Sequence, residues 1–477
     1  MSAAPSPAHS VLWLADADRR VGAALPAPPL DGELEVDVCV VGGGYVGLWT
    51  ALRLRELAPE RTVALLEADR CGGAASGRNG GFVHSWWLSI GALTARVGEA
   101  EALRLARLSG AAVEELAGFC ARERIAADLV PGGWLWTSTA PAQDGAWAGA
   151  VARAAREPEP PLRALDGGEI RRRLGSPVHR GGALEPGGMT LQPALLARGL
   201  RRVALARGVR ICERTPMVAL DRDAGVVTTP GGRVRAGTVV LALGAWAAQL
   251  RELRSAVVAV ASDVVATAPL GDALARSGWR GGEGVSNART MVDYYRTTAD
   301  GRIVFGRGGG MLGRGGRIGG RLVYDPGRVA TVSAALDRLV PAARGVARTD
   351  AWGGAVDRSN DGLPLLGRLR GRAPVLYATG LSGNGVGPSL VCARVLASRA
   401  LGIDDRWSRA GLWQRPPARF PPEPLRTLGG RLVRAAVERR EEREDDGRAP
   451  DPLTRLLAGL APGSHNSDHP GEERPPR

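Results

Sequence analysis

The most unusual property of this sequence is that it contains no lysine, so all 63 of its basic residues are arginine. This absence excludes a Walker A phosphate-binding lysine, a pyridoxal-phosphate Schiff base and a kinase strand lysine. Histidine is also scarce: there are five, and two of them, His465 and His469, lie in a polar tail. A multi-histidine metal site or a hydrolase triad is therefore disfavoured, and we expect no metal site and a redox cofactor that supplies the chemistry.

Long apolar runs and paired cysteines are lacking too. No run approaches the roughly eighteen apolar residues of a membrane span, and the N-terminus has no basic segment followed by an apolar one. The five cysteines stand singly, without a C-x-x-C pair, which is typical of a reducing compartment and disfavours zinc and disulfides. We expect a cytoplasmic protein with neither a membrane span nor a signal peptide.

The net charge of +14 raises the question of nucleic-acid binding. Clustered arginines mark phosphate-binding surfaces, but here they are spread over the chain, often beside acids as in VERREEREDDGR at residues 437–448. A solvated surface explains this pattern better, so nucleic acid is not expected as a partner. With 477 residues and 44% hydrophobic content, the chain is long enough for two domains with cores of their own.

Glycine, by contrast, is abundant, and this weakens any glycine motif. The 67 glycines predict about one G-x-G-x-x-G match by chance. Gly308, Gly310 and Gly313 form such a match, but the following RGGRIGGR has too many glycines for a helix. The context of each match must therefore decide.

A second match, at Gly42, Gly44 and Gly47, lies in a convincing context. An apolar strand over residues 36–41 precedes it, and YVGLWTALRLREL, stopped by Pro59, predicts a buried helix after it. The first glycine permits a tight turn, the second a close approach to a pyrophosphate, and the third close packing of helix on strand.

A strand over residues 62–66 follows this helix and delivers Glu67 at its carboxyl end. An acid at this point of a β-α-β unit can accept hydrogen bonds from a ribose, and it argues against a 2′-phosphate. The free N–H groups and the dipole of the helix N-terminus favour the phosphates. The segment predicts a site for NAD or FAD without choosing between them.

A late segment favours FAD. VLYATGLSGNGVGPSLVCARVLASRALG, residues 375–402, repeats the order strand, glycine-rich turn and helix. NAD does not need a second helix N-terminus, whereas a reduced flavin carries negative charge near N1 and C2 that such a terminus stabilises.

Six motifs in order resemble the glycine/D-amino-acid oxidase (DAO) family. They are VVGGGYVGL with Glu67, ASGRNGGFV at 75–83, LALGAWA at 241–247, DGRIVFG at 300–306, WGGAVDRSNDGLPLLG at 352–367 and YATGLSGNGVGPS at 377–389. The resemblance spans roughly residues 30 to 405. It is specific for the family and weak for the substrate.

The resemblance implies an α/β fold in which a Rossmann-type FAD-binding domain carries a second, α+β substrate domain built on an antiparallel sheet. The expected FAD-binding domain is discontinuous, over residues 36–90, 190–250 and 350–402, and the substrate domain takes 91–189 and 251–349. A Pro/Ala-rich N-terminal extension, residues 1–35, is expected to wrap loosely over the first domain. A helical, charged tail, residues 403–477, completes the chain.

The resemblance also assigns cofactor contacts residue by residue. It places the pyrophosphate at Gly42, Gly43, Gly44 and Gly47 and the adenosine ribose at Glu67. It places the flavin side at Ser76, Gly77, Arg78, Asn79, Gly80 and Gly81, the adenine at Met217 or Val218, and the turn beneath the cofactor at Gly244 and Trp246. The flavin edge is assigned to Gly353 and Gly354, and the helix cap aimed at C2 to Gly383, Asn384, Gly385 and Val386.

The implied reaction is hydride transfer from the carbon beside an amine nitrogen to flavin N5, which oxidises an amine or amino acid to an imine. Catalytic candidates are His84, Tyr294, Tyr295 and Arg296. For His84 a role near the flavin and a structural role both stay open, and strand packing is the favoured alternative for the two tyrosines.

Two departures from the family pattern matter. Several oxidases of the family place a lysine over the flavin to activate oxygen, and this chain has none, so oxygen or another electron acceptor stays open. No cysteine stands at residues 352–355, where some relatives attach the cofactor, so we expect non-covalent FAD. Two alternative functions stay open: a tRNA wobble-base modifying FAD enzyme and a flavin-binding protein without catalysis.

Overall fold

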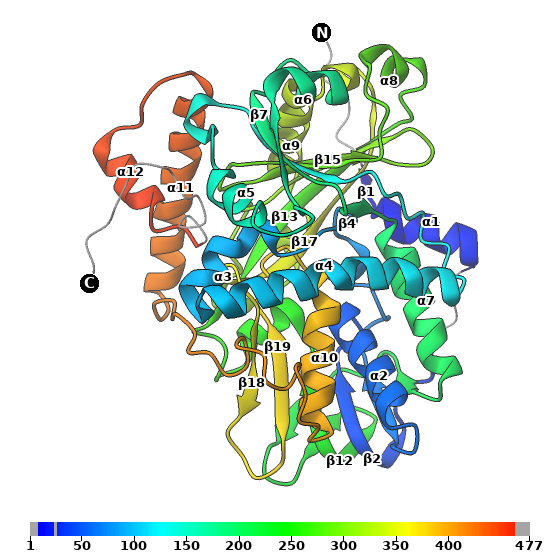
Figure 1. Ribbon diagram of the computed structural model, residues 1–477. Coiled ribbons are helices and arrows are strands. Elements are labelled where there is room, and N and C mark those ends of the chain that lie inside the picture. The colour runs from blue at the N-terminus through cyan, green and yellow to red at the C-terminus, as the bar shows by residue number, and fades with distance from the viewer. Residues whose placement is uncertain (1–7, 23–25, 463–477) are drawn as a thin grey trace.

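The computed structural model describes residues 8–22 and 26–462 of the chain, and two β-sheets with their helices form its frame (Figure 1). The two tail histidines, His465 and His469, lie outside the described residues. The same is true of the start of the expected N-terminal extension, of residues 23–25 and of the end of the expected tail.

The first sheet has eight strands, in the order β10-β11-β12-β2-β3-β9, with β19 beside β12 and β18 beside β19. The pairings β12–β2, β2–β3, β3–β9 and β12–β19 are parallel. The strands are β2 (Gly32–Val41), β3 (Val63–Leu66), β9 (Arg210–Cys212), β10 (Ala219–Asp221), β11 (Val226–Thr229), β12 (Gly232–Leu241), β18 (Leu365–Leu369) and β19 (Val375–Thr379). Every residue of β3 is buried, as a strand covered on both faces requires.

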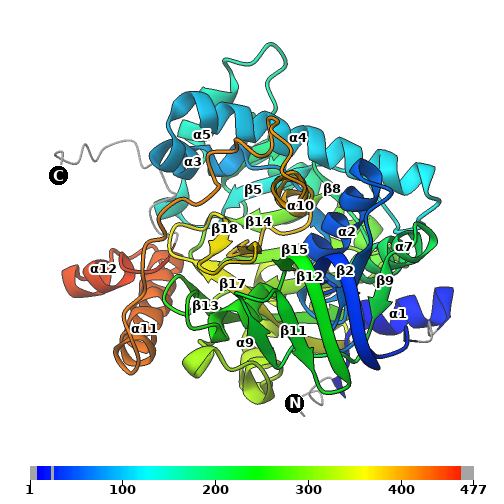
Figure 2. The same cartoon turned by 90° about the horizontal axis from the view of Figure 1, so that it is seen from below.

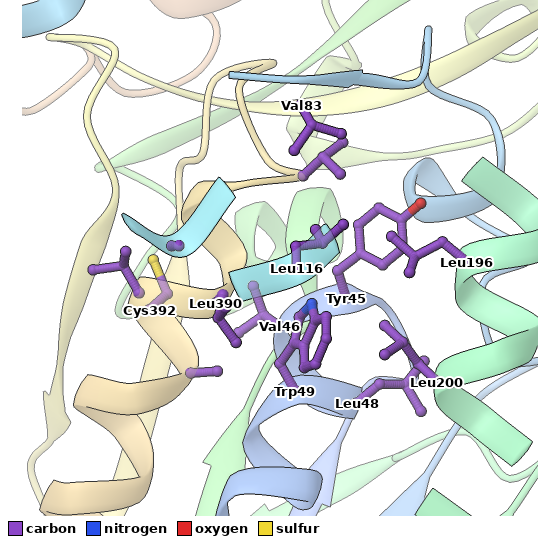
Figure 3. Packing of buried hydrophobic residues seen from close by; sticks show 14 of the residues in the cluster. Tyr45, Val46, Leu48, Trp49, Val83, Leu116, Leu196, Leu200, Leu390 and Cys392 are labelled. Carbon is purple, nitrogen blue, oxygen red and sulfur yellow. The ribbon is translucent and has the colours of Figure 1, made fainter. Parts of the chain in front are cut away.

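Helix α2 (Tyr45–Leu57) is apolar around most of its circumference because three other helices surround it. Its side chains pack against α4 (Glu99–Arg122), α7 (Pro193–Ala206) and α10 (Pro388–Ala400), as Figure 3 shows around Leu48 and Trp49. The order β2, α2, β3 confirms the β-α-β unit that the sequence predicts, and β19 followed by α10 confirms the late strand, turn and helix.

The second sheet has nine strands in the order β1-β17-β13-β16-β15-β14-β5-β7-β6. Most pairings are antiparallel, and β1–β17 and β5–β14 are parallel. The strands are β1 (Ala8–His9), β5 (Trp134–Ser138), β6 (Arg163–Asp166), β7 (Gly181–Glu185), β13 (Val257–Thr267), β14 (Gly284–Asn287), β15 (Asp293–Thr297), β16 (Ile303–Arg307) and β17 (Arg348–Ser359). The expected fold class, a Rossmann-type α/β part with a second part on an antiparallel sheet, is confirmed. The domain boundaries stay a prediction, and the one near residue 350 falls inside β17.

The two faces of the nine-stranded sheet pack against different layers. Alternate residues of its strands, such as Trp134, Val264 and Trp352, join the core that contains α2, α4 and α10. Their direct neighbours Leu135 and Val265 join a second core with α9 (Pro326–Leu339) and α6 (Gly167–Leu174). We call the first the inner face and the second the outer face.

Smaller elements fill the space around the inner face. β4 (Phe82–Val83) and β8 (Met189–Thr190) form a separate two-stranded sheet. In the chain, each of these strands stands between a strand of one large sheet and a strand of the other. The helices α3 (Ile90–Val97) and α5 (Ala148–Ala154) pack beside α4, and α8 (Asp272–Ser277) lies toward the outer side. No helix among residues 8–22 and 26–462 is long and apolar enough to cross a membrane.

The described part of the N-terminal extension is more tightly packed than the loose wrap that the sequence predicts. Helix α1 (Leu12–Val21) buries Trp13 in the main core, and the Gln192 side chain donates a hydrogen bond to its carbonyl at 2.8 Å. Ser10 contacts Asp350 through its hydroxyl, next to the pairing of β1 with β17. Apolar anchoring by one tryptophan outweighs the Pro/Ala composition that suggested a loose segment.

The C-terminal segment forms two helices at one edge of the molecule (Figure 2). They are α11 (Leu425–Asp445) and α12 (Pro452–Ala458), both within the tail that was expected to be helical and charged. A small core of Met291, Ala436, Val437, Ala458 and Ala461 joins these helices to the nine-stranded sheet.

Candidate cofactor and substrate site

The turn between β2 and α2 and the first turn of α2 each contain one position that accepts only glycine. Gly42 has a φ of +111°, and a Cβ there would lie 2.2 Å from the carbonyl oxygen of Ala242. A Cβ at Gly47 would lie 1.9 Å from the carbonyl oxygen of Gly42. The tight turn and the close contact of helix and strand that the motif predicts are therefore both present.

Glu67 lies at the end of β3 and faces this turn. Its Oε2 accepts a hydrogen bond from the Gly43 N–H at 2.7 Å, and its Oε1 accepts one from the Asp69 N–H at 2.9 Å. Burial raises the pKa of its carboxyl group, and these two bonds oppose the shift. Two carboxylate oxygens offer about four acceptor positions, so the same group can also accept a ribose hydroxyl.

The 75–81 loop, predicted to contact the flavin, is fastened to the start of α2. Ser76 Oγ accepts a hydrogen bond from the Tyr45 N–H at 2.9 Å. The Asn79 amide donates to the carbonyl oxygens of Ala75 and Ser76, both at 3.0 Å, and its Oδ1 accepts from the Gly81 N–H at 2.8 Å. Asn79 thus holds the shape of the loop, a role that its motif position alone does not reveal.

Arg78 is the charged member of the loop. Its Nε donates to the carbonyl oxygen of Gly73 at 2.8 Å, and its own carbonyl oxygen accepts from Trp352 Nε1 at 2.8 Å. Burial lowers the pKa of the guanidinium, and its Nη1 is buried without a hydrogen-bond partner. A Cβ at Gly354 would lie 3.9 Å from Arg78 Cβ, so the predicted flavin-edge glycine is beside this cation.

The 381–387 turn connects β19 to α10 and carries the last predicted cofactor contacts, Gly383, Asn384, Gly385 and Val386. Helix α10 begins at Pro388, so these residues form the turn before the helix and not its first turn. Asp357 fastens the start of the turn by accepting from the Gly380 N–H at 2.6 Å. Asn384 Nδ2 donates to the Ser85 carbonyl oxygen at 3.1 Å, while its Oδ1 is buried without a partner.

The remaining cofactor predictions fall on backbone segments at the edges of the site. Met217 and Val218 lie between β9 and β10, and the Val218 side chain is 62% exposed. Gly244 starts a 3-10 turn and accepts from Thr379 Oγ1 at 3.2 Å, and Trp246 in the same turn is 43% exposed.

These features fit FAD better than a simple turn. The glycines give close approach to the α2 N-terminus, an acid lies where a ribose is expected, and Arg78 and Asn384 each present a buried polar atom without a partner. Buried unpaired polar atoms cost free energy, so a bound polar group that pairs with them is favoured. Which of the predicted residues touch the cofactor stays a prediction.

The inner face of the nine-stranded sheet lies across from these segments. Two of the four catalytic candidates, Tyr294 and Arg296, lie on this face, and a third, His84, packs against it. His84 stacks on Trp134 with ring centroids 3.7 Å apart and an angle of 14°. Burial lowers the pKa of its imidazole to about 4, so the ring is neutral near pH 7. A neutral half-buried imidazole beside the flavin side keeps both interpretations of His84 available.

Tyr294 and Tyr295 lie on opposite faces of β15. Tyr294 belongs to the inner face: its OH hydrogen-bonds Ser262 Oγ at 2.8 Å, and its ring meets Phe82 edge-on at 5.7 Å. Tyr295 belongs to the outer core, where its OH lies 2.6 Å from His179 Nε2. The alternation of side chains along a strand separates the pair, so the candidate role of Tyr295 is not supported.

Arg296 shares the inner face with Tyr294 but is occupied by other groups. Its Nη1 donates to the Leu191 carbonyl oxygen at 2.6 Å, and the guanidinium lies 5.0 Å from the centre of the Trp13 ring. Burial lowers its pKa to about 10. These contacts favour a structural link between β15, β8 and α1 over contact with a substrate.

Three residues of the inner face were not predicted as site residues from the sequence: Glu185, Trp134 and Trp136. Glu185 pairs with Trp134 across β7 and β5, its Oε1 accepts from the Ser85 N–H at 2.9 Å, and its Oε2 is buried without a partner. Burial raises its pKa to about 7. Only the register of β5 and β7 reveals these residues, because their strands carry no motif.

A dinucleotide-binding turn in one sheet and an aromatic face of the other sheet opposite it are what a dinucleotide-dependent oxidoreductase requires. The family model described as "FAD dependent oxidoreductase" (DAO) matches residues 37–399, which is more than half of the chain. The protein therefore belongs to the DAO family of FAD-dependent oxidoreductases.

Individual relatives agree with this assignment. The chain is 31% identical over 397 residues to gamma-glutamylputrescine oxidoreductase of Escherichia coli, covering 80% of this chain and 87% of that protein. It is 28% identical over 395 residues to the probable oxidoreductase OrdL of Haemophilus influenzae, covering 80% and 86%. Glycine oxidase from Geobacillus kaustophilus has a similar fold, with a TM-score of 0.64 and 22% identity over 80% of this chain and 98% of that one.

Proposed function

We propose that the protein oxidises the C–N bond of an amine or amino acid with FAD as the electron acceptor. The observation that carries this proposal is the position of residues 75–85, which are fastened to the α2 N-terminus at Ser76 and to the aromatic inner face at His84. Relatives that are named for the oxidation of gamma-glutamylputrescine and of glycine support the substrate class.

Bound FAD supplies an acceptor for the hydride that leaves the carbon beside the nitrogen. The residues around it exclude water and bind the amine in its neutral form, because an apolar, aromatic surface lowers the pKa of an amine. Tyr294, Trp134 and Trp136 provide that surface on the inner face. Neutral His84 adds no positive charge that would repel a residual ammonium ion.

The test is anaerobic bleaching of the purified yellow protein with a panel of primary and secondary amines and amino acids. We expect loss of the flavin absorbance near the oxidised maximum with at least one of them. A yellow protein that none of them bleaches would contradict the proposal and favour a non-catalytic flavin protein. Nucleic acid that co-purifies and dissociates steeply with salt would favour the tRNA alternative.

We further propose that electrons leave more readily to an acceptor other than oxygen. The chain lacks a lysine that could pair with the charge that develops on oxygen, and arginine is bulkier with a more diffuse charge. Stopped-flow traces should show that an artificial acceptor reoxidises the enzyme faster than air does. Equally fast reoxidation by oxygen would identify an oxidase and direct mutagenesis to His84.

The same proposal includes non-covalent FAD and a cytoplasmic location. Residues 352–355 contain no cysteine, and all five cysteines of the chain are buried and free, which suits a reducing compartment. Acid or heat denaturation should release all of the flavin into the supernatant. Flavin that stays with the precipitated chain would contradict this part.

A further inference from the structure

Helix α11 touches the sheet that carries the inner face, although it lies outside the family match, which ends at residue 399. Glycine oxidase is covered over 98% of its length by 80% of this chain, so that fold is complete without part of this chain. The helix reaches the loop between β14 and β15, residues 288–292, and the contact is polar and buried.

Glu441 is the centre of the contact. Its side chain is 1% exposed, its Oε1 accepts from the Met291 N–H at 2.9 Å, and its Oε2 accepts from Arg289 Nε at 3.1 Å. One helix turn away, Asp445 Oδ2 lies 2.7 Å from Arg289 Nη1. Arg440 adds a bond from Nη2 to Thr290 Oγ1 at 2.6 Å, so two consecutive side chains of the loop and the backbone of a third residue are held by the helix.

The charges around Glu441 are balanced. Three arginines, Arg289, Arg307 and Arg338, face three acids, Asp293, Glu441 and Asp445. The side chains of Arg289 and Asp293 are 3% and 0% exposed. A neutral residue in place of Glu441 would leave a buried positive charge uncompensated, so the geometry of the loop depends on this carboxylate.

The two ends of the loop carry the inner-face aromatic residues. At the β14 end, Trp136 Nε1 donates to the Asn287 carbonyl oxygen at 3.2 Å and Trp134 Nε1 to Ser286 Oγ at 3.1 Å. At the β15 end, the Asp293 N–H donates to Asn287 Oδ1 at 2.9 Å, and Tyr294 is the next residue. A shift of the loop would therefore move both aromatic walls of the proposed substrate site.

We propose that Glu441 is a positioning residue for the substrate site, which it serves by holding the β14–β15 loop and, through it, the inner-face residues Trp136 and Tyr294. The C-terminal helix is thus a part of the catalytic unit that the family match does not include. The expected effect on KM rests on the proposed amine oxidation. The expected effect on the mobility of the β14–β15 loop rests only on the contacts of α11.

The test compares Glu441→Gln with two matched variants of the same helix. Val437→Ala removes buried packing between α11 and α12 while leaving the carboxylate in place, and Glu442→Gln removes an exposed charge one residue away. With the amine that bleaches the wild-type flavin fastest, Glu441→Gln should raise KM about tenfold, because a small misplacement of contact groups costs much of the binding. The FAD dissociation constant of all three variants should stay within about twofold of wild type, and so should the KM of the two controls.

A second readout does not need turnover. Hydrogen exchange of amides 287–294 should be faster in Glu441→Gln than in Val437→Ala, and Glu441→Asp should restore part of the protection because it keeps the charge. If Glu441→Gln does not fold, Arg440→Gln, which loses the Thr290 contact and the ion pair with Glu444 but keeps the Glu441 carboxylate, should show smaller shifts in the same direction.

An unchanged KM together with unchanged exchange in Glu441→Gln would overturn the proposal, even if the melting temperature falls. A lower melting temperature with equal KM in Glu441→Gln and Val437→Ala would reduce Glu441 to a structural role. If no amine bleaches the flavin, the proposed function fails, whereas the exchange of amides 287–294 still decides whether Glu441 holds the loop.

Discussion

The two halves of the site differ in how they are encoded. The nucleotide end of the cofactor half is one continuous stretch: β2, its glycine turn, α2 and β3 with Glu67 follow one another between residues 32 and 67, whereas the residues predicted at the flavin end come from later segments. The substrate half is an inner face to which Trp134, Glu185 and Tyr294 contribute from three different strands. A site built from local turns can be inferred from spacing, whereas a site built on strand register depends on pairings between distant residues.

The halves also differ in what fixes their geometry. In the cofactor half, backbone atoms approach so closely that no side chain fits, as at Gly42 and Gly47. In the substrate half, side chains are held by hydrogen bonds and ring contacts, such as Trp134 with His84 and Tyr294 with Ser262. Substitutions of these close-packed glycines should therefore have all-or-none effects, whereas substitutions of the substrate-half side chains should have graded ones.

The largest effect is expected for Gly47→Val. The new Cβ would lie 1.9 Å from the Gly42 carbonyl oxygen, which neither α2 nor β2 can avoid without moving. We expect a loss of more than about 3 kcal/mol of folding free energy and a purified protein without flavin. The ratio of flavin to protein absorbance and the melting temperature measure both.

Gly429→Ala is the matched control for this glycine. Nothing lies within 4 Å of a Cβ at that position in α11, so alanine should stabilise the helix by about 0.5 to 1 kcal/mol. A yellow, stable Gly47→Val protein would contradict this difference between the halves, because the close-packed turn of the cofactor half would then accept a side chain.

The next largest effect is a pH dependence caused by Glu185. Its pKa in the folded protein, about 7, lies above the ordinary value of 4.5 because the group is buried, so its contribution to stability falls as pH rises through this window. His84 has a pKa of about 4 and stays neutral there. Glu185→Gln has no buried carboxyl group to ionise. The stability of this variant relative to wild type should therefore rise by on the order of 3 kcal/mol between pH 5 and pH 8.

Melting curves of the wild type, Glu185→Gln and the exposed control Glu442→Gln at the two pH values test this. The control should follow the wild type at both. A Glu185→Gln protein that tracks the wild type from pH 5 to pH 8 would show that Glu185 has a charged partner or is ionised throughout, and the inner face would be more polar than described.

The smallest effects are expected for the two tyrosines of β15. Tyr295→Phe loses the bond to His179 on the outer face, so stability should fall by about 1 kcal/mol while KM and the flavin reduction rate stay unchanged. Tyr294→Phe acts on the inner face and should change KM or the reduction rate at least about threefold. Kinetic effects of equal size in both variants would mean that the face of the strand is not what matters.

These contrasts explain how far the sequence could predict the structure. The β-α-β unit and the turn between β19 and α10 were both predicted, because glycines and apolar runs mark them locally. The Tyr294–Tyr295 pair was predicted as one candidate site, because a sequence alone does not tell which residue of a strand faces the cofactor.

Two other features were not predicted from the sequence, for a common reason. Trp13 anchors α1 in the main core although its surroundings are rich in proline and alanine. Glu441 lies in a run of charges that is typical of a solvated helix, yet it is buried because three arginines from distant segments converge on it and its acidic neighbours. Long-range compensation of this kind leaves no local pattern.

The separation of the ribose contact from the substrate face can be tested most directly with Glu67→Ala. Two quantities are measured on this variant: the FAD dissociation constant and the anaerobic rate of flavin reduction. The loss of a charge-assisted ribose bond and of the bond to the Gly43 N–H should weaken FAD by about ten- to a hundredfold. At saturating FAD the reduction rate should equal that of the wild type, because the inner face is untouched. Unchanged FAD affinity, or a slower reduction of the saturated enzyme, would contradict the assignment of the ribose contact to one sheet and of the substrate face to the other.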